Sequence, residues 1–146
     1  MANGFFGEFF LKYKNGEQWE VVNPQKGGKC PVCSNRVKDN KKVFGYKYNG
    51  MRVIIPNLFK TNFASVPGLL HAVLPPTGKG NKRRYGKAAV IHDWLYWMGK
   101  LGKELSDTIF RDAMKVSGVN KVIRECMYWA VKFFGFVAWK KHRKKR

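Results

Sequence analysis

Apolar and polar residues alternate in part along the first sixty residues of the chain, a pattern that favours β-strands. Asn-Gly pairs interrupt it at residues 15–16 and again at residues 49–50, and Asn-Gly is a strong signal for a tight hairpin turn. We therefore predict two hairpins, the first pairing residues 5–13 with 17–22 and the second pairing residues 42–48 with 51–55. The polar, Gly- and Lys-rich residues 23–40 between them are predicted to form an excursion from the sheet.

After Pro56 the spacing of the apolar residues becomes helical. A short apolar segment at residues 69–74 is stopped by Pro75 and Pro76, since proline lacks the N–H donor that a helix needs, and residues 77–84 are predicted to form a loop. Three helices are then expected at residues 85–98, 103–116 and 120–140. The sequence thus predicts an α+β fold, with N-terminal antiparallel β-hairpins packed against three C-terminal helices.

The length and composition are those of one small domain. A chain of 146 residues, 45% of them hydrophobic, is long enough to bury one core and short for two. We expect a single α+β domain over residues 1–139, which includes the basic, cysteine-containing excursion at residues 23–40, and a basic tail at residues 140–146.

The chain is strongly basic, with 29 lysines and arginines against 9 acidic residues and a formal net charge of +20. Such a charge favours binding to nucleic acid, anionic lipid or acidic protein surfaces. The basic residues cluster in the predicted loop and in the tail. The candidate anion-binding residues are Lys79, Lys82, Arg83, Arg84, Lys140, Lys141, Arg143, Lys144, Lys145 and Arg146.

Signals for export or membrane insertion are not found in the sequence. Glu8 occurs early and no basic segment leads into a long apolar run, so we expect no signal peptide. The most apolar stretch, residues 126–139, is interrupted by Lys132 and is shorter than the roughly 20 apolar residues that span a bilayer. The three cysteines are an odd number, which favours a reducing compartment over a disulfide-stapled secreted fold.

Three segments resemble successive motifs of one protein family. They are Lys-Thr-Asn-Phe-Ala-Ser-Val-Pro at residues 60–67, Ala-Ala-Val-Ile-His-Asp-Trp-Leu-Tyr at 88–96 and Ser-Asp-Thr-Ile-Phe-Arg-Asp-Ala-Met at 106–114. The family is catalogued as domain of unknown function 1353, and the resemblance covers roughly residues 54–139. It implies a bacteriophage or prophage origin, and hence a location in the virion or the host cytoplasm, but no mechanism. Asn62 stands where the family usually has an aspartate, which removes a negative charge that a general base or a hard-cation site would use.

The second of these motifs contains residues that suit acid–base chemistry. His92 and Tyr96 are one helical turn apart on the same face, and Asp93 points about a quarter-turn away. Asp107, on the following helix, is the acid best placed to orient the histidine. A hydrolase would use His92 as base and Tyr96 as donor to an oxyanion. The remaining candidates are Asp93 and Asn62, which would support a water or a metal, and Ser65, a further polar contributor.

Two other interpretations apply to the same residues. The spacing His-Asp-x-x-Tyr is also similar to the catalytic helix of secreted phospholipases A2, whose histidine activates water and whose adjacent aspartate binds calcium. This chain lacks both the disulfide framework and the Gly/Cys-rich calcium loop of those enzymes. Alternatively, His92, Asp93, Tyr96 and Asp107 form a buried hydrogen-bonded network that locks the helices to the loop after the sheet.

Cys30 and Cys33 have the spacing of one zinc knuckle, in which two thiolates reach the same tetrahedral ion. No second Cys-x-x-Cys or His-x-x-x-His follows, so a zinc site would need a distant histidine or a second subunit. Apart from this half-site we expect no cofactor. Cys126, in the apolar part of the third helix, is expected to be a small buried hydrophobe.

The third predicted helix carries aromatic residues on all sides. They are Tyr128, Trp129, Phe133, Phe134, Phe136 and Trp139. All-round apolarity suits a central buried helix, which we expect here, and it equally suits an amphipathic segment that lies on a membrane.

Three functions follow from these observations. The first is a non-enzymatic bacteriophage protein, either a virion or tail component or an assembly accessory, that contacts nucleic acid or acidic protein surfaces. Its expected partners are other phage structural proteins first, then nucleic acid, with a membrane third. The second is a hydrolase centred on His92 and Asp107. The third is a membrane-acting protein for lysis or genome delivery.

Overall fold

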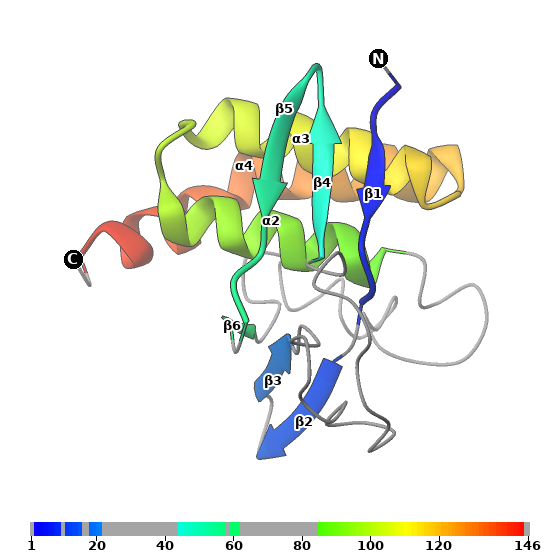
Figure 1. The fold of residues 1–146 in the computed structure, drawn as a ribbon. Coiled ribbons are helices and arrows are strands. Elements are labelled where there is room, and N and C mark those ends of the chain that lie inside the picture. The colour runs from blue at the N-terminus through cyan, green and yellow to red at the C-terminus, as the bar shows by residue number, and fades with distance from the viewer. Residues whose placement is uncertain are drawn as a thin grey trace. The chain divides into compact units, whose positions relative to one another are not determined.

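The computed structural model of the chain describes residues 2–9, 11–15, 18–21, 44–57, 59–61 and 85–144 (Figure 1). The chain forms two compact units, residues 1–62 and residues 63–146, and each is treated by itself. The first unit contains the strands and the second contains the helices, which gives an α+β fold as predicted. The prediction of a single domain stays a prediction. The predicted excursion at residues 23–40, the apolar segment at 69–74 and the loop at 77–84 lie outside the described residues.

The described strands of the first unit form two antiparallel sheets of three strands each. One sheet has the order β1-β4-β5, with bounds Gly4–Phe6, Gly45–Tyr48 and Met51–Ile54. The other has the order β2-β3-β6, with bounds Leu11–Asn15, Gln18–Val21 and Phe59–Thr61.

Both predicted hairpin pairings are confirmed, β2 with β3 and β4 with β5. The turn between β4 and β5 has positive φ at Asn49, 46°, and at Gly50, 82°. Positive φ at both central residues is what a two-residue hairpin turn needs to match the twist of its strands, and Asn-Gly adopts it at little cost. The side-chain oxygen of Asn3 accepts a hydrogen bond of 2.8 Å from the Asn49 N–H, which ties the turn to the N-terminus.

Two details of the strand prediction are wrong. Residues 5–13 do not form one strand, because Gly7 has a φ of 78° and turns the chain between β1 and β2. β1 therefore pairs with β4, while β2 pairs with β3. The chain also does not change to helical structure directly after Pro56, since β6 follows and pairs with β3. Neither pairing is visible in the sequence because both strands have only three residues.

The second unit contains three described helices, α2 (Gly86–Met98), α3 (Lys103–Val116) and α4 (Lys121–Lys144), which contact one another pairwise. Their predicted positions are confirmed, and α4 continues four residues beyond the predicted end. α2 ends at Gly99, whose φ of 67° suits a helix C-cap. Asn120 caps the start of α4, because its Oδ1 accepts a 2.9 Å hydrogen bond from the Val122 N–H.

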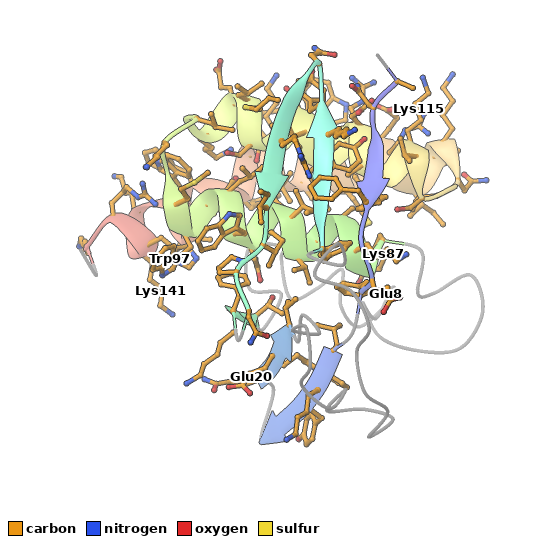
Figure 2. All side chains as sticks on the ribbon, viewed as in Figure 1. Glu8, Glu20, Lys87, Trp97, Lys115 and Lys141 are labelled. Carbon is orange, nitrogen blue, oxygen red and sulfur yellow. The ribbon has the colours of Figure 1, made fainter. Side chains whose placement is uncertain are left out.

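The centre of this unit is α2, not α4. From Ala88 to Tyr96, every residue of α2 except Trp94 is buried. In α4 only Met127, Val131 and Gly135 are buried, whereas Trp129, Phe133, Phe134 and Phe136 are exposed. The prediction that α4 is a central buried helix is therefore wrong, as is the burial of Cys126, which is exposed. Figure 2 shows the side chains on both units, with Lys87 of α2 and Lys115 of α3 labelled among the exposed lysines.

Among the residues that the structure describes, none of the helices has the combination of length and apolarity needed to cross a membrane.

Candidate functional site

A buried carboxylate, that of Asp107, lies where α2 and α3 meet. Its Oδ1 atom is 2.8 Å from Nε2 of His92 and accepts a 2.6 Å hydrogen bond from the hydroxyl of Tyr96. Its Oδ2 atom accepts a 2.6 Å hydrogen bond from the ammonium of Lys103. Asp107 thus contacts both His92 and Tyr96, as predicted for residues that act together, and Lys103 is a further partner.

Helical spacing explains why these groups meet. His92 and Tyr96 are four residues apart on α2, so both side chains project from one face. Lys103 and Asp107 have the same spacing on α3, which brings a cation and an anion together on one face. The contact between the two helices completes the cluster. The Lys-Asp spacing is the signal in the sequence that could have identified Lys103.

Lys103 also connects the cluster to α4. Its ammonium donates to the carbonyl oxygens of Val131, at 3.1 Å, and of Lys132, at 3.0 Å. With the bond to Asp107 the ammonium has three acceptors, and three is the number of donors that it carries. One lysine therefore ties α3 to α4 and also donates to the carboxylate that accepts the hydrogen bond from Tyr96 of α2.

The cluster is closely packed. His92 and Tyr96 are fully buried and Asp107 is 1% exposed. The His92 ring lies 4.1 Å from the Tyr96 ring and 4.6 Å from the Phe110 ring, measured between centroids. Gly135 of α4 allows this approach, because a β-carbon there would lie only 2.5 Å from the Tyr96 hydroxyl oxygen.

The hydrogen bonds set the charge state of Asp107. Burial alone would raise the pKa of this carboxyl, but the hydrogen bond and charge of His92 and the hydrogen bonds from Lys103 and Tyr96 hold its pKa below the ordinary value of 3.8. Burial raises the pKa of Tyr96, and the hydrogen bond to Asp107 and the negative charges of Asp107 and Asp93 raise it further. At neutral pH the carboxylate is ionised and Tyr96 is a phenol that donates to it.

This charge state fixes the roles of the two ring nitrogens of His92. An ionised carboxylate is an acceptor only, so Nε2 carries the hydrogen that lies between it and Asp107. In the neutral ring Nδ1 then carries a lone pair. Nδ1 is buried and has no hydrogen-bond partner within the described ranges. A base oriented by a carboxylate, with its other nitrogen unused, is the arrangement of general-base catalysis.

A cavity of about 530 Å³ between α3 and α4 reaches the other side of the cluster. Lys103 and Asp107 line it, together with apolar side chains that include Phe133 and Phe136. His92 and Tyr96 are not among its lining residues. Lys103 and the almost fully buried Asp107 therefore border this cavity, whereas the histidine does not.

The remaining predicted site residues are distributed as follows. Asp93 is 5% exposed and lies beside His92 on α2. Asn62 and Ser65 lie outside the described residues, as do Cys30, Cys33, Lys79, Lys82, Arg83, Arg84, Lys145 and Arg146. In the described part of the chain no three His, Cys, Asp or Glu residues are grouped so as to hold a metal ion. The zinc half-site stays a prediction.

The described residues of the predicted basic tail belong to the last turns of α4. Lys140, Lys141 and Lys144 are exposed, and Figure 2 labels Lys141. Arg143 instead donates to the backbone carbonyls of Tyr96 and Trp97 and lies over the Trp139 ring at 4.6 Å. It thus caps the C-terminal carbonyls of α2, which the sequence did not indicate.

Comparison with known proteins gives a family but no activity. A family model described as protein of unknown function (DUF1353) matches residues 40–131, more than half of the chain. The chain is also 34% identical over 96 residues to the uncharacterized protein y4iH of Sinorhizobium fredii. That alignment covers 65% of this chain and 39% of the relative, so the chain spans well under half of the relative's length. No solved structure matches the chain.

The lowered pKa of Asp107 predicts how stability depends on pH. A carboxyl with a lower pKa in the folded than in the unfolded protein stabilises the fold above the unfolded value, and this contribution is lost as pH falls through the folded value. Asp107→Asn is expected to lower the free energy of unfolding at pH 7 by about 3–5 kcal/mol, because it breaks a buried ionic cluster. The difference from wild type should shrink as pH falls below 3.8. Urea unfolding of both proteins across this range measures it, and a pH-independent difference would contradict the assignment.

The close approach of Gly135 to Tyr96 gives a second prediction. Alanine is intrinsically better than glycine in a helix by about 1 kcal/mol. Gly135→Ala should nevertheless destabilise the protein by about 1–3 kcal/mol, because its methyl group overlaps the Tyr96 hydroxyl. In a Tyr96→Phe background this overlap is relieved, so the same substitution should cost less. Thermal unfolding of the four proteins tests this coupling, and an equal cost in both backgrounds would refute it.

Proposed function

We propose that this chain, which belongs to the family of proteins of unknown function DUF1353, is a hydrolase in which Nδ1 of His92 takes a proton from an attacking water. One observation carries the proposal: Nε2 of His92 is bound to an ionised, fully supported carboxylate, while Nδ1 is buried with no partner among the described residues. Buried polar atoms in native proteins are nearly always hydrogen-bonded, so an exception calls for an explanation such as catalysis.

The roles of the neighbouring residues follow from their contacts. Asp107 holds the ring in the tautomer with Nδ1 free and stabilises the imidazolium that forms when Nδ1 takes the proton. Tyr96 and Lys103 keep Asp107 ionised and fixed in position. These three are positioning residues, and His92 is the catalytic one.

Carboxylic esters are the substrate class that we propose. The oxygen of the activated water bonds to the ester carbonyl carbon, and its proton passes to Nδ1. The carbon–alkoxide bond then breaks and the same nitrogen returns the proton to the leaving oxygen. One acid–base residue is enough for both steps. Because His92 is fully buried, the site has to open for substrate, and we expect this opening to limit turnover.

A purely structural role for the cluster is the main competing explanation. It accounts for the hydrogen bonds to Asp107, since such networks also serve to fix helix packing. It gives Nδ1 of His92 no role, whereas the hydrolase proposal assigns one to this buried atom.

Ester hydrolysis by purified variants tests the proposal. The probes are p-nitrophenyl butyrate and phosphatidylcholine/phosphatidylglycerol vesicles, with release of nitrophenol or fatty acid as the measurement. The wild type is expected to hydrolyse at least one probe. His92→Gln and Asp107→Asn should each lower kcat by about 10²–10⁴-fold, the usual contribution of a general base. Long-range ¹H–¹⁵N spectra should show the neutral His92 ring protonated at Nε2.

Asp112→Asn is the matched control, because it makes the same chemical change on the same helix and should leave kcat unchanged. The folded state of each variant is checked by circular dichroism, so that unfolding is not taken for loss of activity. Folded wild-type protein that hydrolyses neither probe, or a His92→Gln variant that keeps the wild-type rate, would overturn the proposal.

A second candidate function is that of a bacteriophage virion, tail or assembly component that binds nucleic acid or an acidic partner. The formal charge of +20 supports it, as do the exposed Lys140, Lys141 and Lys144 in the last turns of α4. The phage origin is itself a proposal, which rests on the resemblance of the sequence motifs.

Salt dependence of DNA binding tests this second candidate. Binding to duplex DNA should weaken steeply with salt, and Lys141→Gln should reduce the slope of log K against log salt by about 0.9, the contribution of one phosphate contact. Lys115→Gln, at an exposed position on α3, should leave the slope unchanged. Fluorescence anisotropy between 50 and 200 mM salt, about the range where such contacts are decisive, measures both. Equal effects of the two substitutions would argue against a contact at the end of α4.

A further inference from the structure

α4 carries an unusual number of exposed apolar residues. Four of them, Val122, Trp129, Phe133 and Phe136, are seven, four and three residues apart in turn, which is the spacing of one helix face, and Phe134 and Val137 lie next to this line. Their exposed fractions run from 47% to 75%. We call this surface the outer face of α4, and it consists of Val122, Trp129, Phe133, Phe134, Phe136 and Val137.

A contiguous patch of exposed apolar side chains usually marks a binding site. Single exposed apolar residues are ordinary on soluble proteins, but several large ones on one helix face are not. The rings of Trp129 and Phe133 stack on each other, with centroids 5.6 Å apart, so they form one continuous apolar surface.

Lysines border the outer face. The ammonium of Lys132 lies 5.0 Å from the Trp129 ring centroid, and that of Lys140 lies 4.4 Å from the Phe136 ring centroid. Towards the C-terminus a groove of about 570 Å³ has Phe136 and Val137 as its apolar part and is completed by lysines, namely Lys140, Lys141 and Lys144. Apolar side chains and cationic ends are thus in contact within the same surface.

We propose that the outer face of α4 binds the surface of a membrane rich in anionic phospholipid. The helix lies in the plane of the interface, with its apolar side chains at the boundary between headgroups and acyl chains and its lysines at the phosphates. A basic helix with aromatic residues on its apolar face is suited to this position.

Charge distinguishes this partner from a second copy of the chain. Each copy carries a formal charge of +20, and four lysines border the face, so pairing two outer faces would bring like charges together. An anionic lipid surface pairs these lysines instead and also covers the phenylalanines. Nucleic acid would pair the lysines but would leave the aliphatic Val122 and Val137 exposed to water, since its phosphates offer them no contact.

Vesicle binding by the full chain tests the proposal, independently of hydrolysis. Wild-type protein is expected to co-sediment with phosphatidylglycerol-containing vesicles and to bind pure phosphatidylcholine vesicles at least ten times more weakly. The double variant Phe133→Asp/Phe136→Asp should bind anionic vesicles about 100-fold more weakly, because two large apolar side chains no longer enter the interface. Lys140→Gln/Lys141→Gln should lose about 30-fold, from two fewer surface cations.

Val116→Asp is the matched control, because it places the same charge at an exposed apolar position on α3 and should not affect vesicle binding. His92→Gln should bind vesicles as the wild type does, so failure of the hydrolase proposal and failure of this one are distinguishable. All substituted positions except His92 are exposed, and circular dichroism verifies that the variants are folded.

Measurements on the same variants also test whether the outer face of α4 binds a different partner. A wild-type dimer in sedimentation velocity that dissociates in Phe133→Asp/Phe136→Asp would assign the face to self-association and overturn the proposal. Tight binding of a single-stranded oligonucleotide that the same variant loses, without vesicle binding by the wild type, would assign it to nucleic acid. Equal binding to neutral and anionic vesicles, or undiminished binding by the double variant, would also overturn it.

Discussion

The ionised carboxylate of Asp107 is the constraint on which the helical unit depends. A charge in that position is very costly unless every oxygen has donors, and breaking such a cluster leaves the charge uncompensated. α2 supplies His92 and Tyr96, and α3 supplies Lys103. Because Lys103 is also bound to carbonyls of α4, Asp107 and its partners connect all three helices.

α2 and α4 both depart from the usual pattern in which polar residues are exposed and apolar residues are buried. α2 is buried almost throughout and keeps a histidine and an aspartate inside, whereas α4 exposes several of its aromatic residues. The cavity between α3 and α4 connects the two features, since Asp107 and the outer-face residues Phe133 and Phe136 all line it. Residues of an apolar surface and of a buried acid–base cluster thus border the same cavity.

Features that depend on neighbouring residues were predicted from the sequence more successfully than features that depend on contacts between distant residues. The Asn49-Gly50 turn and the bounds of α3 follow from backbone preference and helical periodicity, which neighbouring residues fix among themselves. The division of the first predicted strand at Gly7, and the pairing of β6 with β3, depend on contacts between residues distant in the chain. The candidate site shows the same division. Its one-turn spacing from His92 to Tyr96 was predictable, whereas the contacts of Lys103 and Arg143 with other helices were not.

The sequence by itself determined the α+β class, the three C-terminal helices and the choice of His92, Tyr96 and Asp107 as a group. These depend on spacing along the chain, which the sequence states directly. Only the tertiary structure decided which side of α4 is outside. A helix with aromatic residues on all sides has no polar face to mark the solvent, so packing against α2 and α3 selects the buried side, and the sequence does not.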